Sequence, residues 1–364
     1  MRTADTEPEP ASDHDGQHFV VRLLDAWYVA CQSRQLRQRP ISRRIFNTPI
    51  VLFRGSDGRP AALLDRCAHR NAPLSLGTCQ DGALECPYHG WLFGTDGGCQ
   101  GIPALCGSQP GRGHRVPRFE TQEQQGFVWV YARADVEPKT TPFVFPHVDE
   151  PAYATVRYQA TSPGTLHANL ENILDVPHTA YLHRGLFRGV ERNKVTATVR
   201  RFAKHAEAEF VGEPVPKGLL GRILAPRGGT VVHFDRFVLP SIAQVDYALG
   251  ENHVIATTAL TPTRDDEVVL NSVITFKTVM PRILIQPLLV PIGKRVLAQD
   301  RAMLKAQLQR IQDFGKEQFV STEVDLLGPH IWRLLRQAAR NVPEPQETTP
   351  DLPAVFENTV ELMA

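Results

Sequence analysis

The sequence predicts an α+β protein of two domains, a small all-β domain followed by a mixed domain. Three observations lead to this prediction. Short apolar runs separated by tight turns fill the region from Trp27 to Tyr131. Four prolines then interrupt residues 135–151, as in a linker. Longer β-branched runs follow, and from Gly293 to Phe314 the apolar period becomes helical.

Turn chemistry supports the first domain. Ile50–Phe53 and Ala61–Leu64 are apolar runs that flank the turn-forming residues 55–58, Gly-Ser-Asp-Gly, in the pattern of a β-hairpin. The apolar and aromatic run Gly126–Tyr131 is predicted to close the domain as a strand.

The second domain is predicted from alternating strand and helix signals. Part of His167–His183 is expected to be helical, and four later runs are expected to be strands. These runs cover residues 194–200, 230–238, 253–260 and 267–277.

The same patterns divide the chain into four parts. Residues 1–18 are predicted to be a disordered acidic lead-in, because the first sixteen residues hold five acids, one arginine and no apolar core; for the same reason no signal peptide is expected. The all-β domain is placed at residues 19–135 and the mixed domain at 136–345. The tail after Arg340 is rich in Pro and Glu, and residues 346–364 are expected to be loose.

Composition excludes some classes of function. The chain has 42% hydrophobic and 22% charged residues and a formal net charge of +1, which gives no reason to expect nucleic acid as a partner. No run of 18 apolar residues is present, so no membrane span is expected. The apolar stretch Ile283–Ile292 is predicted to be buried core, with a membrane-touching or substrate-channel segment as the alternatives. Six cysteines confined to one stretch favour a metal domain, and we expect a reducing cytoplasm.

The first metal motif consists of two short segments, each with one thiolate and one imidazole. Cys67-Ala-His69-Arg is followed after 16 residues by Cys86-Pro-Tyr-His89-Gly-Trp. A Rieske [2Fe–2S] centre needs two cysteines on one iron and two histidines on the other, and these segments supply that set. A structural zinc knuckle is the alternative, although zinc loops usually carry Cys-x-x-Cys pairs. The other cysteines have no partner pattern and are expected to be small buried hydrophobes: Cys31, Cys79, Cys99 and Cys106.

A second constellation lies in the other domain. Two histidines and one carboxylate on one face of an iron leave open positions for O₂ and substrate, and Asp175, His178 and His183 lie close together in the sequence. The two histidines are five residues apart, so a helix end or distortion between them is needed for both to reach one ion. Lone histidines such as His233 and His253 are expected to be ordinary hydrogen-bonded residues.

A carboxylate ligand can also come from a distant part of the chain, where Asp300, Asp313 and Asp325 are the candidates. At about 100° per residue, Asp300 falls within an apolar helical stripe, while Asp313 falls nearly opposite. Because a buried carboxylate is costly unless it is paired or metal-bound, we favour Asp300. The stripe consists of Leu297, Leu304, Leu308 and Ile311.

These motifs together resemble the Rieske non-haem iron oxygenase family, over most of residues 25–315. The resemblance implies a Rieske domain followed by a helix-grip catalytic domain with an antiparallel sheet. It assigns Cys67, His69, Cys86 and His89 to the Rieske cluster.

The resemblance also implies roles in the second domain. His178 and His183 are assigned as ligands of a mononuclear iron, together with Asp300 on a late helix. Asp175 is assigned as the carboxylate that links this iron to a Rieske histidine of a neighbouring subunit, which implies a homotrimer. Asn172 matches a position near the iron.

The family implies an oxygenase that uses O₂ and electrons from a separate ferredoxin or ferredoxin reductase. NAD(P)H enters only through that reductase, since no Gly-rich dinucleotide fingerprint is present. The chain length and the sequence around Cys86 and His89 are most similar to those of the monooxygenase and demethylase branch. This branch includes vanillate demethylase, dicamba monooxygenase and pheophorbide a oxygenase. The expected reaction is hydroxylation or oxidative dealkylation of an aromatic, polycyclic or natural-product substrate. A dihydroxylating dioxygenase α-subunit and a non-catalytic Rieske electron carrier are the alternatives.

Charge is distributed unevenly along the chain. Residues 17–134 carry fourteen arginines, no lysine and eight acids. Because arginine-rich surfaces steer acidic partners, the cluster Arg34–Arg44 is a candidate docking face for the electron donor. An ordinary solvated surface is the alternative.

Overall fold

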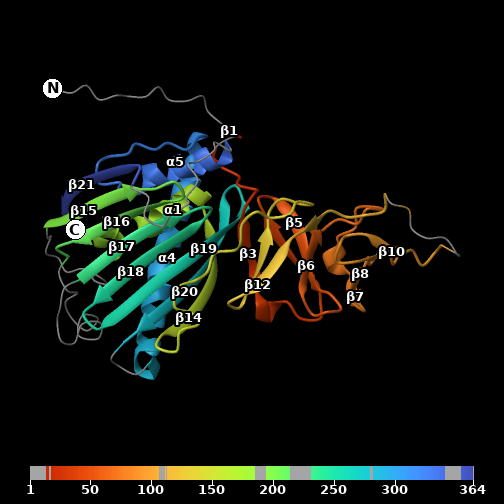
Figure 1. Cartoon of the computed structure of the whole chain (residues 1–364). Helices are drawn as coiled ribbons and strands as arrows, with labels where there is room; N and C mark the ends of the chain where they lie inside the picture. Colours follow the sequence, from red (N-terminus) through yellow and green to blue (C-terminus); the bar gives the residue numbers. More distant parts are fainter. Residues whose placement is uncertain are drawn as a thin grey trace.

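The structure is a computed structural model. It describes residues 14–15, 18–105, 111, 113–184, 194–213, 231–278, 282–340 and 354–363, with the backbone alone for 14–15, 18–19 and 282–290. The chain forms two parts that lie side by side (Figure 1). The predicted architecture, a small all-β part followed by a part with a large antiparallel sheet, is confirmed.

The N-terminal part is built from small antiparallel sheets around two apolar clusters. Tyr28, Leu52 and Val128 belong to the first cluster, and Cys67 and Trp91 belong to the second. The sheet orders are β12-β13-β3, β11-β6-β5-β4 and β10-β9-β8-β7, with a separate pair β1-β2. The strands are β1 (His14–Asp15), β2 (His18–Phe19), β3 (Trp27–Gln32), β4 (Ile41–Ile45), β5 (Thr48–Arg54), β6 (Pro60–Leu64), β7 (Thr78–Gln80), β8 (Ala83–Glu85), β9 (Leu92–Phe93), β10 (Cys99–Gly101), β11 (Arg118–Phe119), β12 (Thr121–Gln124) and β13 (Phe127–Tyr131), with the 3-10 turns η1 (Ser33–Gln35) and η2 (Leu74–Leu76).

The C-terminal part is an eight-stranded antiparallel sheet in the order β14-β20-β19-β18-β17-β16-β15-β21. Its strands alternate between buried and more exposed residues, as a sheet with two different faces requires. They are β14 (Ala154–Pro163), β15 (Lys194–Arg201), β16 (His205–Val211), β17 (Val231–Val238), β18 (Ile242–Leu249), β19 (Asn252–Arg264), β20 (Glu267–Lys277) and β21 (Phe356–Met363).

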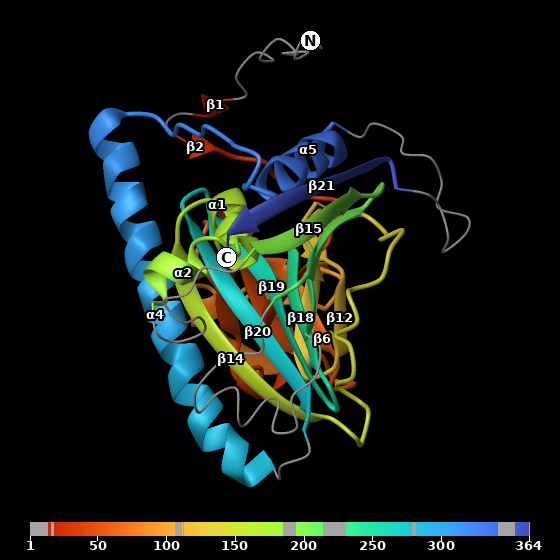
Figure 2. The same cartoon turned by 90° about the vertical axis from the view of Figure 1, so that its left-hand side faces the viewer.

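Helices cover one face of this sheet. Helix α1 (Leu166–Leu174) is capped by Thr165, whose side chain accepts a hydrogen bond from Ala168 N. The leucines of α1 lie at four-residue spacing and pack on the sheet, and α5 (Gly328–Ala339) packs on it beside them. The short helix α2 (Thr179–Leu182) and the long helix α4 (Arg282–Phe314) lie beside β14 (Figure 2).

The N-terminal part packs on the opposite face of the same sheet. Trp27 and Trp129 share an apolar cluster with Ala259 and Val273 of β19 and β20. Thr261 Oγ1 also donates a hydrogen bond to the main-chain oxygen of Val29 at 2.7 Å. The large sheet therefore separates the all-β part from the helices that cover its other face.

Two predictions differ from the structure. The tail was expected to be loose, but Phe356–Met363 form β21, which pairs with β15 along eight residues because Leu362 is buried in the core and the strand covers the edge of β15. The helix predicted from Gly293 starts at Arg282, eleven residues earlier, and runs through Pro287 and Pro291. The side chains up to residue 290 lie outside the described ones, so the burial of Ile283–Ile292 stays a prediction.

The beginning of the chain also bears on a prediction. Residues 1–13 of the expected disordered lead-in lie outside the described residues, and next to them β1 and β2 form a two-residue ladder that the prediction did not include. Among the described helices, none has both the length and the apolar composition needed to cross a membrane.

Burial of His167 predicts a pH-dependent stability. Its ring packs between Phe319 and Trp332, Nε2 lies 3.1 Å from the Gly328 oxygen, and burial lowers the pKa to about 4. The folded chain therefore binds fewer protons than the unfolded chain between pH 6.5 and 4. Through His167 alone, the free energy of unfolding should fall by about 3 kcal/mol as the pH drops through that window.

Urea unfolding followed by far-UV circular dichroism between pH 4 and 7 measures this dependence. The variant His167→Gln should have a shallower dependence, with a remainder from His330, whose pKa is also lowered to about 4 by burial and the nearby Arg201. An unchanged pH dependence in the variant would contradict the assignment.

Candidate metal centres

The end of α1 brings two histidines together. Helix α1 stops at Leu174, Asp175 has an extended backbone, and α2 is a single turn with His178 before it and His183 after it. This break lets side chains five residues apart converge, as the sequence spacing required. Their Nε2 atoms lie 3.2 Å apart.

Helix α4 adds the carboxylate. Asp300 Oδ1 lies 3.0 Å from His183 Nε2 and 3.6 Å from His178 Nε2. Among the residues that the structure describes, this is the one group of three metal-ligating side chains with converging atoms. Asp313 instead pairs with Arg310 at the surface and Asp325 accepts from Thr322, so of the three candidates only Asp300 reaches the histidines.

Neighbouring groups orient both rings. His178 Nδ1 hydrogen bonds to the main-chain oxygen of Asp175 and lies 3.5 Å from its Oδ2, while His183 Nδ1 lies 3.1 Å from Gln299 Oε1. Carbonyl oxygens can only accept, so each Nδ1 carries a proton and each Nε2 is directed at the other ring and at Asp300. The contact of Gln299 was not foreseen from the sequence, where its position next to Asp300 was the available signal.

This donor set fits a divalent metal ion. Two nitrogen ligands at right angles and about 2.1 Å from a metal would be about 3 Å apart, close to the observed separation. Asp300 Oδ1 is buried with no hydrogen-bond donor assigned to it. Burial alone would lower the pKa of His178, but Asp175 and Asp300 outweigh it and raise the pKa to about 9, so the site favours positive charge. Two imidazoles and a carboxylate on one side suit non-haem iron.

Two further predicted residues lie on the same segment. The carboxylate of Asp175 is 31% exposed beside His178, and it can therefore contact both this ring and a group from outside the chain. Asn172 lies one turn earlier on α1, partly exposed, and makes no hydrogen bond to the described residues. The structure brings Asp175 to the histidine pair and leaves Asn172 at the approach to it.

The two Cys/His loops of the N-terminal part have the same backbone conformation. Cys67 N donates to Ala72 O and Asn71 N to Cys67 O. In the second loop Cys86 N donates to Trp91 O and Gly90 N to Cys86 O, with the same spacings. The fourth residue after each cysteine has a positive φ, 61° at Asn71 and 70° at Gly90, which glycine and asparagine tolerate best. Two equivalent turns therefore present the two pairs symmetrically.

Their side chains meet between the loops. The rings of His69 and His89 have centroids 4.6 Å apart, and His69 stacks on Trp91 at 4.7 Å and 3°. His69 Nδ1 is buried without a hydrogen bond. The thiols of Cys67 and Cys86 are buried and adjacent, and burial raises the pKa of Cys67 although the His69 and Arg70 N–H groups lower it. A cluster that takes thiolate on one side and imidazole on the other fits this arrangement.

The remaining cysteines largely match their predicted role. Cys31 is fully buried in the first apolar cluster, and Cys79 and Cys99 are half-buried against the second. Cys106 lies outside the described residues.

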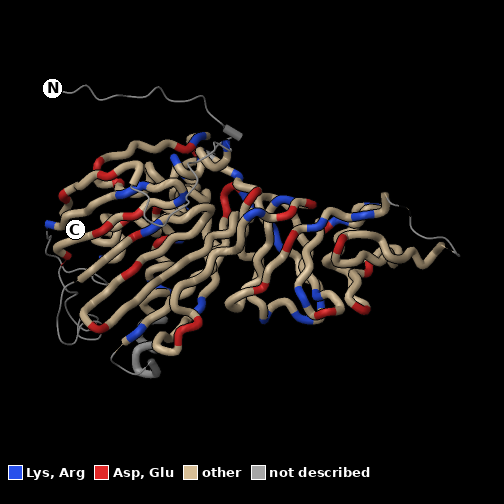
Figure 3. Tube along the Cα trace, viewed as in Figure 1, with Lys and Arg blue, Asp and Glu red and all other residues tan. Residues whose placement is uncertain are grey.

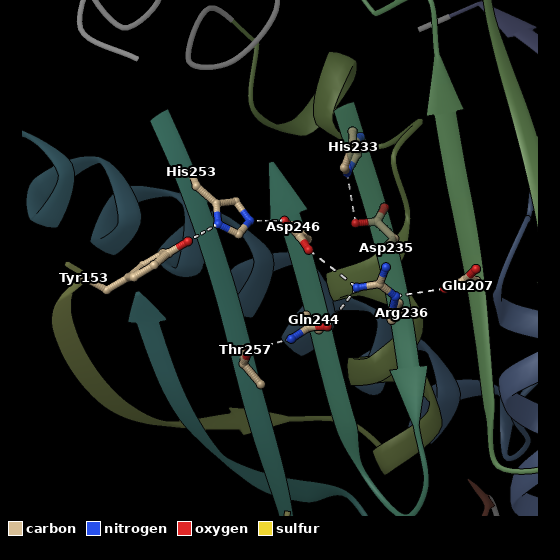
Figure 4. Close-up of polar contacts among 9 residues, drawn as sticks. All are labelled: Tyr153, Glu207, His233, Asp235, Arg236, Gln244, Asp246, His253 and Thr257. Atoms are coloured by element: carbon tan, nitrogen blue, oxygen red, sulfur yellow. Dashed lines mark hydrogen bonds and ion pairs between the residues drawn. The ribbon is translucent and has the colours of Figure 1, made fainter. Parts of the chain in front are cut away.

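The isolated histidines belong to polar networks on the large sheet (Figure 4). Tyr153 bonds to His253 Nδ1 at 2.6 Å and His253 Nε2 to Asp246 at 2.8 Å. His233 is buried between the rings of Phe210 and Tyr247 and pairs with Asp235 and Glu213. Both are hydrogen-bonded or ion-paired, as expected from the sequence, and neither is in the group formed by His178, His183 and Asp300.

Two family matches cover most of the chain. Residues 26–119 match the Rieske [2Fe-2S] domain, and residues 165–341 match the vanillate O-demethylase oxygenase C-terminal domain. The chain belongs to the Rieske oxygenase family. Membership in this family implies a Rieske [2Fe–2S] cluster and a mononuclear iron, and each of the two sites lies within one of the matched regions.

Individual relatives of this Rieske oxygenase are more distant. The oxygenase component of dicamba O-demethylase from Stenotrophomonas maltophilia is 38% identical over 164 residues, which are 44% of this chain and 48% of that protein. The vanillate O-demethylase oxygenase subunit of a Pseudomonas species is 36% identical over 170 residues, 44% of each chain. These alignments span about half the length of the curated relatives.

Solved structures extend the similarity of the fold. A crystal structure of dicamba monooxygenase bound to dicamba superposes with a TM-score of 0.73 over 88% of this chain and 98% of the other, at 24% identity. NdmA of Pseudomonas putida CBB5 superposes with a TM-score of 0.70 over 87% of this chain and 91% of the other, at 22% identity. At these identities the superpositions show that the two-part fold is shared.

The geometry predicts separable metal sites. His178→Ala or Asp300→Ala should remove the mononuclear iron and all turnover, because each removes one of three convergent ligands. The Rieske absorption and electron paramagnetic resonance spectra should persist, because those ligands lie in the other part of the chain. Iron analysis should fall from three to two per chain, and bleaching of the cluster in either variant would contradict the two-site assignment.

Proposed function

We propose that this chain is the oxygenase component of a Rieske monooxygenase or demethylase. It would use O₂ and two electrons to hydroxylate or oxidatively dealkylate an organic substrate, with the second oxygen atom released as water. The observation that supports this most is the group of His178, His183 and Asp300 in the same chain as two Cys/His loops. A protein that only carries electrons needs no such second site.

The side chains have distinct tasks in this proposal. A mononuclear iron would supply O₂ activation, and Cys67, His69, Cys86 and His89 would hold the cluster that stores one electron. His178, His183 and Asp300 bind from one side and leave the other side open. Gln299 and Asp175 keep the Nδ1 protons in place, so that neither ring turns away from the open side.

The sheet beside α1 offers an apolar surface for substrate. Four apolar side chains on the face of the sheet that carries α1 are partly exposed: Val245, Val254, Ala256 and Ile274. Their neighbours Ala243 and Leu260 on the same face are fully buried. Such a surface suits an aromatic, polycyclic or natural-product substrate. The relatives are named for small aromatic and heterocyclic substrates, dicamba, vanillate and methylxanthine.

Electrons would come from a separate ferredoxin or ferredoxin reductase that oxidises NAD(P)H. We propose the cytoplasm as the location, because cysteines clustered in a metal domain, with no disulfide among the described ones, suit a reducing compartment.

Turnover with ¹⁸O₂ and a reconstituted reductase over a panel of methyl ethers, N-methyl heterocycles and hydroxylatable aromatics tests this function. We expect one labelled oxygen in a hydroxylated product, or formaldehyde release from a methylated one, coupled to NAD(P)H oxidation. A cis-diol with two labelled oxygens would instead identify a dihydroxylating dioxygenase. Cluster reduction without substrate-dependent O₂ uptake anywhere in the panel would indicate an electron carrier.

Asp175 motivates a homotrimer. The strands β7–β10 next to the cluster loops lie at the far end of the N-terminal part from α1 (Figure 1), and electron tunnelling falls steeply with distance. A neighbouring chain can place its cluster against the exposed Asp175 carboxylate beside His178. Light scattering should therefore give three chains per particle. An active monomer would refute the arrangement.

The variant Asp175→Asn should keep both metal centres and the trimer. It should nevertheless slow electron transfer from cluster to iron by orders of magnitude, because the amide cannot serve as an anionic acceptor for two imidazole N–H groups. Single-turnover kinetics measure this step, and a normal rate would remove Asp175 from the pathway.

A further inference from the structure

The arginines of the N-terminal part fall into two sets. Residues 17–134 hold fourteen arginines, of which all but Arg112 are described. Six of them are ion-paired with a carboxylate within 4 Å: Arg22, Arg54, Arg59, Arg115, Arg118 and Arg133. Seven form no ion pair with a described acid, and we call them the basic face: Arg34, Arg37, Arg39, Arg43, Arg44, Arg66 and Arg70.

A part-buried hydrogen-bond network links β4 to the segment before the first cluster loop. Ser42 Oγ on β4 donates to Asp65 Oδ2 at 2.8 Å, and Ser75 N and Oγ donate to the same carboxylate at 2.8 and 2.6 Å. Asp65 is two residues before Cys67, so this network joins β4, which carries Arg43 and Arg44, to the segment that carries Arg66. Asp65 has both oxygens occupied by these donors.

Neutral acceptors hold several of these guanidinium groups. Arg37 Nε donates to Arg34 O at 3.1 Å, and Arg44 Nη1 donates to Asn47 O at 2.7 Å. Arg43 donates to two main-chain oxygens and to Gln35 Oε1. Such contacts fix the direction of a guanidinium without neutralising it. In this protein, where forty bases face thirty-nine acids, seven arginines without a described ion pair between residues 34 and 70 are a local excess that overall composition does not require. Basic segments lie along both the lower side and the upper edge of the N-terminal part (Figure 3).

We propose that the basic face is the docking site of an acidic one-electron carrier protein of the ferredoxin type. This inference rests on the proposed function, since it names the surface through which that oxygenase receives electrons. Unpaired arginines offer bidentate donors to carboxylates of a partner. The location fits the task, because Arg66 and Arg70 flank Cys67 and His69, and a protein seated there lies beside the cluster. Clustered charge of one sign also raises association rates at low ionic strength.

Anaerobic stopped-flow reduction of the cluster tests the proposal. The probe is an acidic [2Fe–2S] ferredoxin, kept reduced by its NADPH-dependent reductase, and bleaching of the Rieske absorption is the readout. Arg39→Glu/Arg44→Glu reverses two exposed charges of the basic face and spares Arg43, whose hydrogen bonds support β3 and β4. The matched control is Arg59→Glu/Arg115→Glu, which changes the net charge equally at two ion-paired arginines of the same part.

The second-order rate constant at low salt should fall by roughly tenfold or more in the first variant and by less than about twofold in the control, because steering depends on where the charge lies. The wild-type rate should fall with added salt, and the variant should lose most of that dependence. Reduction by dithionite should bleach the cluster in all three proteins, which confirms that folding and cluster content are intact.

Three results would overturn the proposal. Equal losses in both variants would assign the effect to net charge. No loss at low salt, or no reduction of the wild type by ferredoxin, would leave the basic face as solvated surface. A third result concerns other polyanions. If the wild type binds duplex DNA or phosphatidylserine vesicles, and the first variant loses this binding but keeps its ferredoxin rate, the face belongs to another anionic partner. The experiment needs no substrate, O₂ or mononuclear iron, so a chain that fails the ¹⁸O₂ test can still pass this one.

Discussion

Two imidazole nitrogens held 3.2 Å apart with their lone pairs toward each other are the constraint on which the catalytic part depends. Such a pair repels unless a cation or a shared proton lies between the nitrogens. The Asp300 carboxylate, 15% exposed and 3.0 Å from His183 Nε2, makes the same demand, because a largely buried negative charge needs a positive partner. The three groups come together favourably only with positive charge between them, which a metal ion or a proton on His178 can supply. The surrounding fold must therefore supply the free energy that keeps them in place, and it does so through packing remote from the site.

That packing comes from three elements. Helix α1 is anchored by Leu166, Leu170 and Leu174, and burying each leucine contributes about 2 kcal/mol, so its end at Asp175 is a fixed point. Helix α4 extends past the site in both directions, with Leu297 packed against the main core and Leu304 buried. Asp300 therefore reaches the histidines from a rigid support. The large sheet carries both helices on one face and the all-β part on the other.

Local chemistry predicted the ligands better than it predicted the elements. Cysteine, histidine and carboxylate types at short spacings were sufficient to single out the Cys67 and Cys86 loops and the His178/His183 pair, because metal chemistry restricts the residue types. The choice of Asp300 among the distant carboxylates depended on the helical spacing of the apolar residues around it. The strand β21 and the start of α4 were not foreseen, since Phe356–Met363 forms a strand through pairing with a partner more than 150 residues away. Gln299 was missed for a related reason: which side chain orients His183 depends on how α4 lies against α2, and no local pattern encodes that.

The two centres differ in exposure, and the difference matches their proposed tasks. At the cluster, His89 and the neighbouring Tyr88 are exposed, the latter by 64%, so an external protein can approach within a few ångströms of the redox group. At the triad, the side chain of His183 is 2% exposed and that of Asp300 15%. An open cluster can exchange single electrons with partners, while a buried triad restricts the access of water to the open side of the metal and strengthens each charge interaction there. In the proposed cycle electrons cross from the exposed centre to the buried one, and the partly exposed Asp175, which lies beside His178, is the residue that we propose for this step.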